Sequence, residues 1–270
     1  YMQLYIRHET VYRYDHPLKY TIQSLRLTPR RDAGQRTLQW RLSAPGRHVE
    51  QLDAHGNVAH LLTLEEPHSE IAIVVSGVVD TGDAGASTLP DDGPLSPLAY
   101  LAPTPLTQPN ARIQEFAARH LSGGGALRGR LERLGEAIAG TIRYRPGVTD
   151  VTDGAASVFE RGEGVCQDQA HAFVACCRAL HIPARYVSGY FHTGDAGSVA
   201  SHAWADAWLG DEASWVSIDL THRALAGPRH CRLAVGRDYL DAAPVRGVRH
   251  GGGAEQLRVN VTVGASAAQQ

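Results

Sequence analysis

Alternating polar and apolar positions dominate the N-terminal part of the chain. The side chains expected on one face of its first segment are Leu4, Ile6, His8, Thr10 and Tyr12. Alternation with a period of two predicts a half-buried strand. Shorter strand patterns follow at 37–45 and 59–67, and the continuous apolar run at 71–80 is typical of a buried strand. Short strands separated by turn-forming residues predict an antiparallel β-sandwich domain over residues 1–85.

The pattern changes to helical spacing in the middle of the chain. Residues 86–109 are rich in proline and glycine, which predicts a linker. Helices are predicted over 110–121, with Asn110 as the N-cap, and over 127–142. The glycine-rich stretch at 122–126 is interpreted as a turn rather than a phosphate-binding loop, because no lysine follows at the required position and no strand precedes it.

A third helix, from Cys166 to about Leu180, is followed by three strand patterns. These strands are predicted at 184–191, 201–209 and 214–220. The order of elements predicts an α+β fold in which the third helix packs on an antiparallel sheet. We therefore expect a second domain over 110–263 that includes a C-terminal strand, and a frayed tail at 264–270.

The composition is that of an ordinary globular protein. Apolar residues make up 43% and charged residues 20% of the 270 residues, and the net charge is −2. This charge gives no electrostatic argument for nucleic acid or an anionic membrane as a partner. No stretch approaches the ~20 apolar residues of a membrane-spanning helix. The N-terminal residues also lack the pattern of a secretory signal, so we expect a cytoplasmic protein.

Of the four cysteines, Cys166 has a distinct setting, whereas Cys176, Cys177 and Cys231 are interpreted as small buried apolar residues. No C-x-x-C spacing occurs, which argues against a zinc knuckle or a redox motif. In a reducing compartment a disulfide framework is not expected. Cys166 faces inward in the first turn of its helix, where unpaired N–H groups and the helix dipole favour a thiolate. The same N–H groups can stabilise a developing oxyanion.

Two later strands direct a histidine and an aspartate to one face of the predicted sheet. His202 alternates with small apolar residues on its strand, and Asp219 alternates with apolar residues on the next one. A two-residue turn at Gly210-Asp211 would place His202 directly opposite Asp219. A longer turn that shifts the pairing by an even number of residues, so that the numbers of paired residues still add to an odd total, would keep both side chains on one face of the sheet. The sequence therefore predicts Cys166 as nucleophile, His202 as base and Asp219 as orienting acid.

The helix and strand segments resemble the core of the bacterial transglutaminase-like superfamily in three stretches, GEGVCQDQAHAFVACCRALHIPARYVSGY, SHAWADAWL and WVSIDLT. The resemblance implies a papain-like cysteine fold and the same Cys–His–Asp triad. The segments RHETVYRYDHPL and LRLTPR resemble the β domain that precedes the enzyme in one bacterial subgroup, and the tail AVGRDYLDAAPVRGVRHGGG is also similar to that subgroup. The subgroup usually reads Asp-Pro-Thr-Asn where this chain has Asp219-Leu220-Thr221-His222. The acid is retained, and the loop that follows differs.

Several other residues have two interpretations. Asp168 and His171 are interpreted as structural residues that lock the helix to a neighbouring loop. His171 is an alternative base, but it lies five residues beyond Cys166 and so roughly 140° around the helix, with its ring directed elsewhere. Tyr144 is a candidate oxyanion donor. Three aromatic residues fit a substrate groove or the core equally well: Tyr190, Trp204 and Trp208.

A zinc site formed by histidines is the main alternative chemistry. The four candidates are His171, His202, His222 and His230. No H-x-x-x-H or H-E-x-x-H pair occurs and the spacing of the four fits no metal-site pattern, so we predict neither a metal nor a cofactor.

The function predicted from these residues is thiol-dependent acyl transfer. We expect a peptidase or amidase that acts on a peptide or protein amide through a thioester, with transglutamination of an amine as the alternative. A non-catalytic binding module and a metal-dependent hydrolase are the competing classes. The first would not require the triad to be retained, and the second would require the zinc site.

Overall fold

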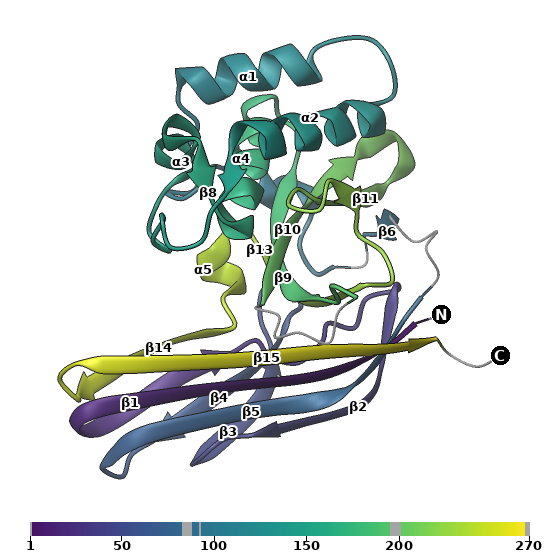
Figure 1. The fold of residues 1–270 in the computed structure, drawn as a ribbon. Helices are drawn as coiled ribbons and strands as arrows, with labels where there is room; N and C mark the ends of the chain where they lie inside the picture. The colour runs from purple at the N-terminus through teal and green to yellow at the C-terminus, as the bar shows by residue number, and fades with distance from the viewer. Residues whose placement is uncertain (1, 83–87, 92, 195–200, 268–270) are drawn as a thin grey trace.

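The computed structural model describes residues 2–82, 88–91, 93–194 and 201–267. Two antiparallel sheets and a layer of helices make up most of the fold (Figure 1). The helices lie on the smaller sheet, and the larger, curled sheet lies beyond it and contains both the first and the last strand. This arrangement confirms the predicted α+β class.

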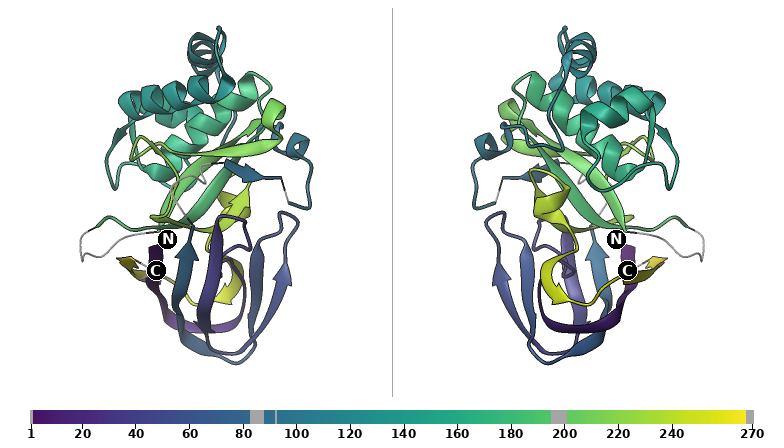
Figure 2. Two further views of the ribbon diagram at one scale, coloured as in Figure 1. Left: turned by 90° about the vertical axis from the view of Figure 1, so that its right-hand side faces the viewer. Right: turned by 90° about the vertical axis from the view of Figure 1, so that its left-hand side faces the viewer.

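Seven strands form the larger sheet, namely β1 (Met2–Leu25), β2 (Gln35–Ser43), β3 (Arg47–Leu52), β4 (Val58–Leu64), β5 (His68–Thr81), β14 (Val245–Gly251) and β15 (Glu255–Ala267). β1 pairs with β5 and β15 along its first half, and with β4 and β14 along its second half. The sheet curls over itself (Figure 2) and encloses an apolar core that includes Leu18, Leu62 and Ile73. The predicted sandwich is thus built from one sheet whose central strand serves both halves.

The C-terminal strand belongs to the larger sheet, which corrects the predicted second domain. β15 pairs antiparallel with β1, and Ile6 lies opposite Val263. Val261 and Val263 are buried in one cluster with Ile6, so β15 covers apolar surface that β1 would otherwise expose. β15 also runs through 264–267, where fraying was predicted. Residues 268–270 of that predicted tail lie outside the described residues.

The smaller sheet has the strand order β12-β11-β10-β9-β13, and β6 pairs with β11. Its strands are β6 (Thr88–Pro90), β9 (Ala184–Phe191), β10 (His202–Leu209), β11 (Ser214–Asp219), β12 (Ala224–Leu225) and β13 (His230–Gly236). The helices on it are α1 (Ala111–Leu121), α2 (Leu127–Thr141), α3 (Ala155–Arg161) and α4 (Cys166–Ala179). As predicted, the small apolar residues of β10 face the core, where Ala205 is buried with Phe173 of α4. No helix among the described residues is long and apolar enough to span a membrane.

Short elements flank the core. β7 (Arg143–Tyr144) and β8 (Glu163–Gly164) form a parallel pair before α4, and α5 (Tyr239–Ala242) follows β13. The segment predicted as a linker, 86–109, contributes β6 and the 3-10 helix η1 (Pro97–Tyr100). Its apolar residues Leu89 and Tyr100 are buried against Trp215, which explains why this stretch is held against the smaller sheet. Residues 86, 87 and 92 lie outside the description.

Buried polar contacts join the two sheets at β13. Arg232 donates from Nε to Asp32 Oδ2 at 2.8 Å, and its Nη1 donates to Asp206 Oδ1 at 3.1 Å. Asn57 donates to the carbonyl oxygen of Val235 and accepts the N–H of the same residue, each at 2.8 Å. Since these groups are buried, the protein partners replace the water that they lose on folding. The N-terminal strands are therefore fixed beside the sheet that carries the predicted site.

Candidate active site

Cys166 is the first residue of α4 and is partly exposed, whereas the other three cysteines are buried. Asp168, in the first turn, accepts a hydrogen bond from the N–H of Val165 at 2.8 Å and from the hydroxyl of Thr149 at 2.7 Å. These bonds cap the helix and fix a neighbouring loop to it, which is the structural role predicted for Asp168. A Cβ atom at Gly164 would lie 2.7 Å from the same carboxylate, so this close approach requires glycine.

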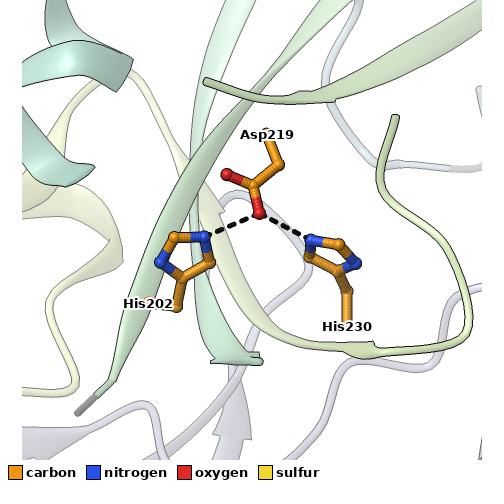
Figure 3. Close-up of side chains that lie close together, drawn as sticks. All are labelled: His202, Asp219 and His230. Atoms are coloured by element: carbon orange, nitrogen blue, oxygen red, sulfur yellow. Dashed lines mark hydrogen bonds and ion pairs between the residues drawn. The ribbon is translucent and has the colours of Figure 1, made fainter. Parts of the chain in front are cut away.

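His202 and Asp219 meet although they are not directly opposite each other in the sheet. β10 and β11 are joined by the 3-10 turn η2 (Gly210–Glu212), and Leu209 pairs with Ser214. The predicted two-residue turn is therefore wrong. The observed pairing is shifted by two residues from the predicted one, and side chains alternate with a period of two. The side chains of His202 and Asp219 therefore stay on the same face of the sheet. His202 Nε2 lies 2.8 Å from Asp219 Oδ2 through a diagonal contact (Figure 3).

The groups on either side of His202 favour its protonated form. Burial lowers the pKa of His202, but hydrogen bonds with Asp219 and Cys166, together with their charges, outweigh burial and raise that pKa to about 9. Burial likewise raises the pKa of Asp219, and the hydrogen bonds from neighbouring histidines hold it well below its usual range. The structure thus brings the three residues of the predicted triad together. An imidazolium between a sulfur and a carboxylate is an arrangement that stabilises a thiolate.

Two further histidines contact the same carboxylate oxygen. His222 Nδ1 and His230 Nε2 each lie 2.8 Å from Asp219 Oδ2. The His230 side chain is buried, whereas that of His222 is 37% exposed and stacks on Phe191. From the sequence, both were candidates only for the zinc alternative, His222 was also noted as a departure from the subgroup's pattern, and their contact with the acid was not predicted. The available signal was the position of His222, three residues after Asp219.

The ligand types of a metal site are present around Asp219. The ligand atoms of His202, Asp219 and His230 all lie within 4.8 Å of one another, and imidazole with carboxylate is a donor set that zinc accepts. The spacing argument therefore failed to foresee that three of the four histidines converge. His171 lies apart on α4, where its Nε2 accepts the N–H of Tyr239 at 3.0 Å. Burial lowers the pKa of His171 to about 4, in keeping with the structural role predicted for it.

The aromatic candidates divide between the core and the surface. Tyr190 and Trp204 are fully buried, and their polar atoms bind His8 Nδ1 at 2.8 Å and Ser217 Oγ at 3.0 Å, so both are core residues. Trp208 is partly buried and packs on the core cluster of Leu89, Tyr100 and Trp215.

Tyr144 remains a candidate oxyanion donor. It lies on β7, where it pairs with Gly164, and half of its surface is exposed. Burial raises the pKa of Tyr144, and Cys166 in its ionised form would raise it further, so the phenol keeps its proton and lies within electrostatic reach of the sulfur.

Gln169 joins the nucleophile helix to the loop that follows Asp219. Its Oε1 accepts the hydroxyl proton of Thr221 at 2.7 Å, and its Nε2 donates to the carbonyl oxygen of Ile142 at 2.9 Å. Gln169 and its bond to Ile142 are buried, whereas the bond to Thr221 is partly buried. Gln169 was not predicted as a site residue from the sequence. Gln169 and Thr221 belong to stretches that carried the family resemblance, but which residues they would contact could not be read from either stretch alone.

Comparisons with known proteins agree with this architecture. The family model described as "Bacterial transglutaminase-like N-terminal region" matches residues 4–80, and the one described as "Transglutaminase-like superfamily" matches residues 114–220. An uncharacterized protein of Mycobacterium leprae is 30% identical, with 95% of this chain and 96% of that protein covered. An uncharacterized protein of Mycobacterium tuberculosis is also 30% identical, with 90% and 86% covered.

A solved structure shares the whole fold. It is the crystal structure of "a Putative Cysteine Protease" from Cytophaga hutchinsonii, with a TM-score of 0.79 and 24% sequence identity. The match covers 100% of this chain and 92% of that one. Both the curled sheet and the smaller sheet with its helices therefore recur together in another protein.

Proposed function

The chain belongs to the transglutaminase-like superfamily, and from this premise we propose that it is a cysteine-dependent acyl-transfer enzyme that cleaves amide bonds. Cys166 is the proposed nucleophile, His202 the acid–base group and Asp219 the residue that orients it. The observation that carries the proposal is the 2.8 Å contact between His202 Nε2 and Asp219 Oδ2, on a histidine that also bonds Cys166 at the first turn of α4.

The proposed reaction has two halves. In the first, the Cys166 thiolate attacks the amide carbonyl carbon, the C–N bond breaks, and the amine leaves with the proton of the His202 imidazolium. A thioester then joins the acyl group to the sulfur. In the second half a water molecule attacks the thioester while His202 takes its proton, the C–S bond breaks, and the acid departs. The N–H groups at the start of α4, with Tyr144 as a candidate second donor, would stabilise the oxyanion in both halves.

Hydrolysis is proposed over transglutamination. The same triad serves both reactions, because only the group that attacks the thioester differs. A transglutaminase must hold an amine and exclude water at this step. Transglutamination is retained as the second candidate because the matched superfamily carries that name. The third class, a binding module without catalysis, is disfavoured by the joint presence of the sulfur, the imidazole and the carboxylate in contact. A cytoplasmic location and a peptide or protein substrate stay predictions.

The experiment that tests this proposal is substrate profiling. Purified protein is incubated with a library of peptides that contain glutamine, with and without a fluorescent primary amine, and the products are identified by mass spectrometry. Cleaved or deamidated peptides from the wild type and none from Cys166→Ala are the expected result, while incorporated amine would establish the transferase instead. Cys176→Ala is the matched control. Cys176 is fully buried, so this variant should retain activity. Equal turnover by wild type and Cys166→Ala would refute thiol catalysis.

A further inference from the structure

His230 lies behind the proposed triad as a buried neighbour of its acid. It is the first residue of β13, and its Nε2 lies 2.8 Å from Asp219 Oδ2 (Figure 3). The side chain of His230 is 6% exposed and that of Asp219 is fully buried. His202 approaches the same oxygen from β10. Two buried imidazoles from different strands therefore converge on one carboxylate oxygen.

The backbone of the preceding turn determines where the ring proton of His230 lies. The N–H of Gly227 donates to His230 Nδ1 at 3.1 Å, and the N–H of His230 donates to the carbonyl oxygen of Gly227 at 2.9 Å. A ring nitrogen that accepts a hydrogen bond carries no proton, so the proton of a neutral His230 is on Nε2. Burial lowers the pKa of His230, which keeps the ring neutral. Nε2–H then donates to Asp219.

We propose that His230 is a positioning residue: its neutral imidazole donates a hydrogen bond that holds the Asp219 carboxylate in the orientation that His202 requires. This inference rests on the proposed function and names a fourth member of its machinery. The other groups that hold the carboxylate are His202 and the partly exposed His222, whose Nδ1 lies 2.8 Å from Oδ2 and whose backbone N–H donates to Oδ1 at 3.2 Å. His230 adds a donor that is buried and fixed by the backbone of the Gly227 turn, and so further restricts rotation of the carboxylate.

The groups that surround His230 are consistent with this role. Rings pack on it from two strands: Phe191 of β9 at 4.7 Å and Trp204 of β10 at 5.1 Å between centroids. The titratable groups beside it are Asp219 and His202, and the partly exposed His222 contacts the same carboxylate. His230 does not need to touch substrate to act, because its effect passes through Asp219.

The tautomer of His230 argues against a metal site at this cluster. A metal ion bound at Nε2 would require the ring proton on Nδ1. A proton on Nδ1 would face the N–H of Gly227, so two hydrogen-bond donors would point at each other. Histidines that bind metals place the second ring nitrogen against an acceptor instead. The convergence of His202, Asp219 and His230 is therefore better explained by hydrogen bonding around one carboxylate.

The test compares two substitutions of nearly equal size. His230→Gln keeps an amide N–H donor that can reach Asp219, whereas His230→Met fills the same space without a donor. The readout is the second-order rate of Cys166 alkylation by iodoacetamide as a function of pH, with folding checked by circular dichroism. His230→Met should slow alkylation at neutral pH about tenfold and move the rise of the rate to higher pH, because the imidazolium that stabilises the thiolate is held less firmly. His230→Gln should restore the wild-type profile.

The outcomes separate this proposal from the proposed function. Alkylation of wild-type Cys166 that is no faster than that of a small model thiol would refute the triad itself. If the alkylation rate of wild-type Cys166 rises at low pH and folded His230→Met shows the same dependence on pH, only the positioning role is refuted. A long-range ¹H–¹⁵N spectrum gives an independent check, in which His230 should carry its proton on Nε2. A proton on Nδ1, or zinc binding by the wild type that His230→Gln abolishes, would overturn the proposal.

Discussion

His202 Nε2 lies 2.8 Å from Asp219 Oδ2 even though the pairing of β10 and β11 places neither residue directly opposite the other. The contact is diagonal across the sheet, and the carboxylate that makes it is fully buried. Removing this carboxylate should therefore change the charge of His202. It would also leave the neighbouring histidines without their hydrogen-bond acceptor.

Asp219→Ala should lower the pKa of His202. Without the carboxylate, only Cys166 opposes the effect of burial on the ring, so the pKa of His202 should fall below about 9. The imidazolium that stabilises the Cys166 thiolate is then weakened, and alkylation by iodoacetamide at pH 7 should slow about tenfold. Asp219→Asn is the matched control, because its carbonyl oxygen can still accept one hydrogen bond. Equal alkylation rates for wild type and Asp219→Ala would contradict the assigned role.

Stability should decrease as pH rises through the pKa of His202. A group whose folded-state pKa is raised stabilises the fold fully below its unfolded pKa, and this contribution disappears above the folded pKa. The shift from about 6.5 to about 9 corresponds to roughly 3 kcal/mol, lost between those two pH values. Urea unfolding at pH 6 and pH 10 measures it. His202→Gln should show a smaller pH dependence than the wild type, and an identical dependence in both would exclude His202 as the source.

Cys166 should react far faster than the other three cysteines. Burial raises the pKa of Cys176 to about 12, and it raises the pKa values of Cys177 and Cys231 as well, so these thiols are both protonated and inaccessible. Brief treatment with iodoacetamide at neutral pH, followed by peptide mapping, should find label on Cys166 at a level at least about tenfold above that of any other cysteine. Labels spread evenly over the four positions in folded protein would contradict the environment described for α4.

Arg232 should be required for the two sheets to stay together. Arg232→Met removes the shared partner of the buried Asp206 and Asp32, which keep only Arg185 and Arg30. Because these arginines still compensate part of the charge, the loss should be below the roughly 3–5 kcal/mol of a fully uncompensated buried charge and above that of an exposed pair. Burial raises the pKa of Asp206, but Arg232 and Arg185 hold that pKa at about 2, so the carboxylate is charged throughout the neutral range. Urea unfolding at pH 7 measures the loss.

Arg13→Met is the control for this prediction. Arg13 forms an exposed pair with Glu70 in the larger sheet, and such pairs contribute about 0–1 kcal/mol. A loss for Arg232→Met that is no larger than the loss for Arg13→Met would show that the buried network contributes little to stability.

The local pattern of the chain was sufficient to predict the three proposed catalytic residues. The position of Cys166 in a first helical turn, and the faces on which His202 and Asp219 lie, follow from the periods of the helix and the strand. The wrong turn length did not matter, because a shift of two residues returns each side chain to the same face. The α+β class followed from the order of the same elements.

The tertiary structure alone decided what depends on contacts between distant parts of the chain. β15 pairs with β1, although the two strands lie at opposite ends of the sequence, and β6, which lies within the predicted linker, pairs with β11. Likewise, His230 reaches Asp219 because β13 lies beside β9 and the Gly227 turn fixes its ring. Sequence periodicity states which face of an element is buried, but not which element will cover it. That choice is made by the total apolar area and the buried hydrogen bonds of the assembled fold.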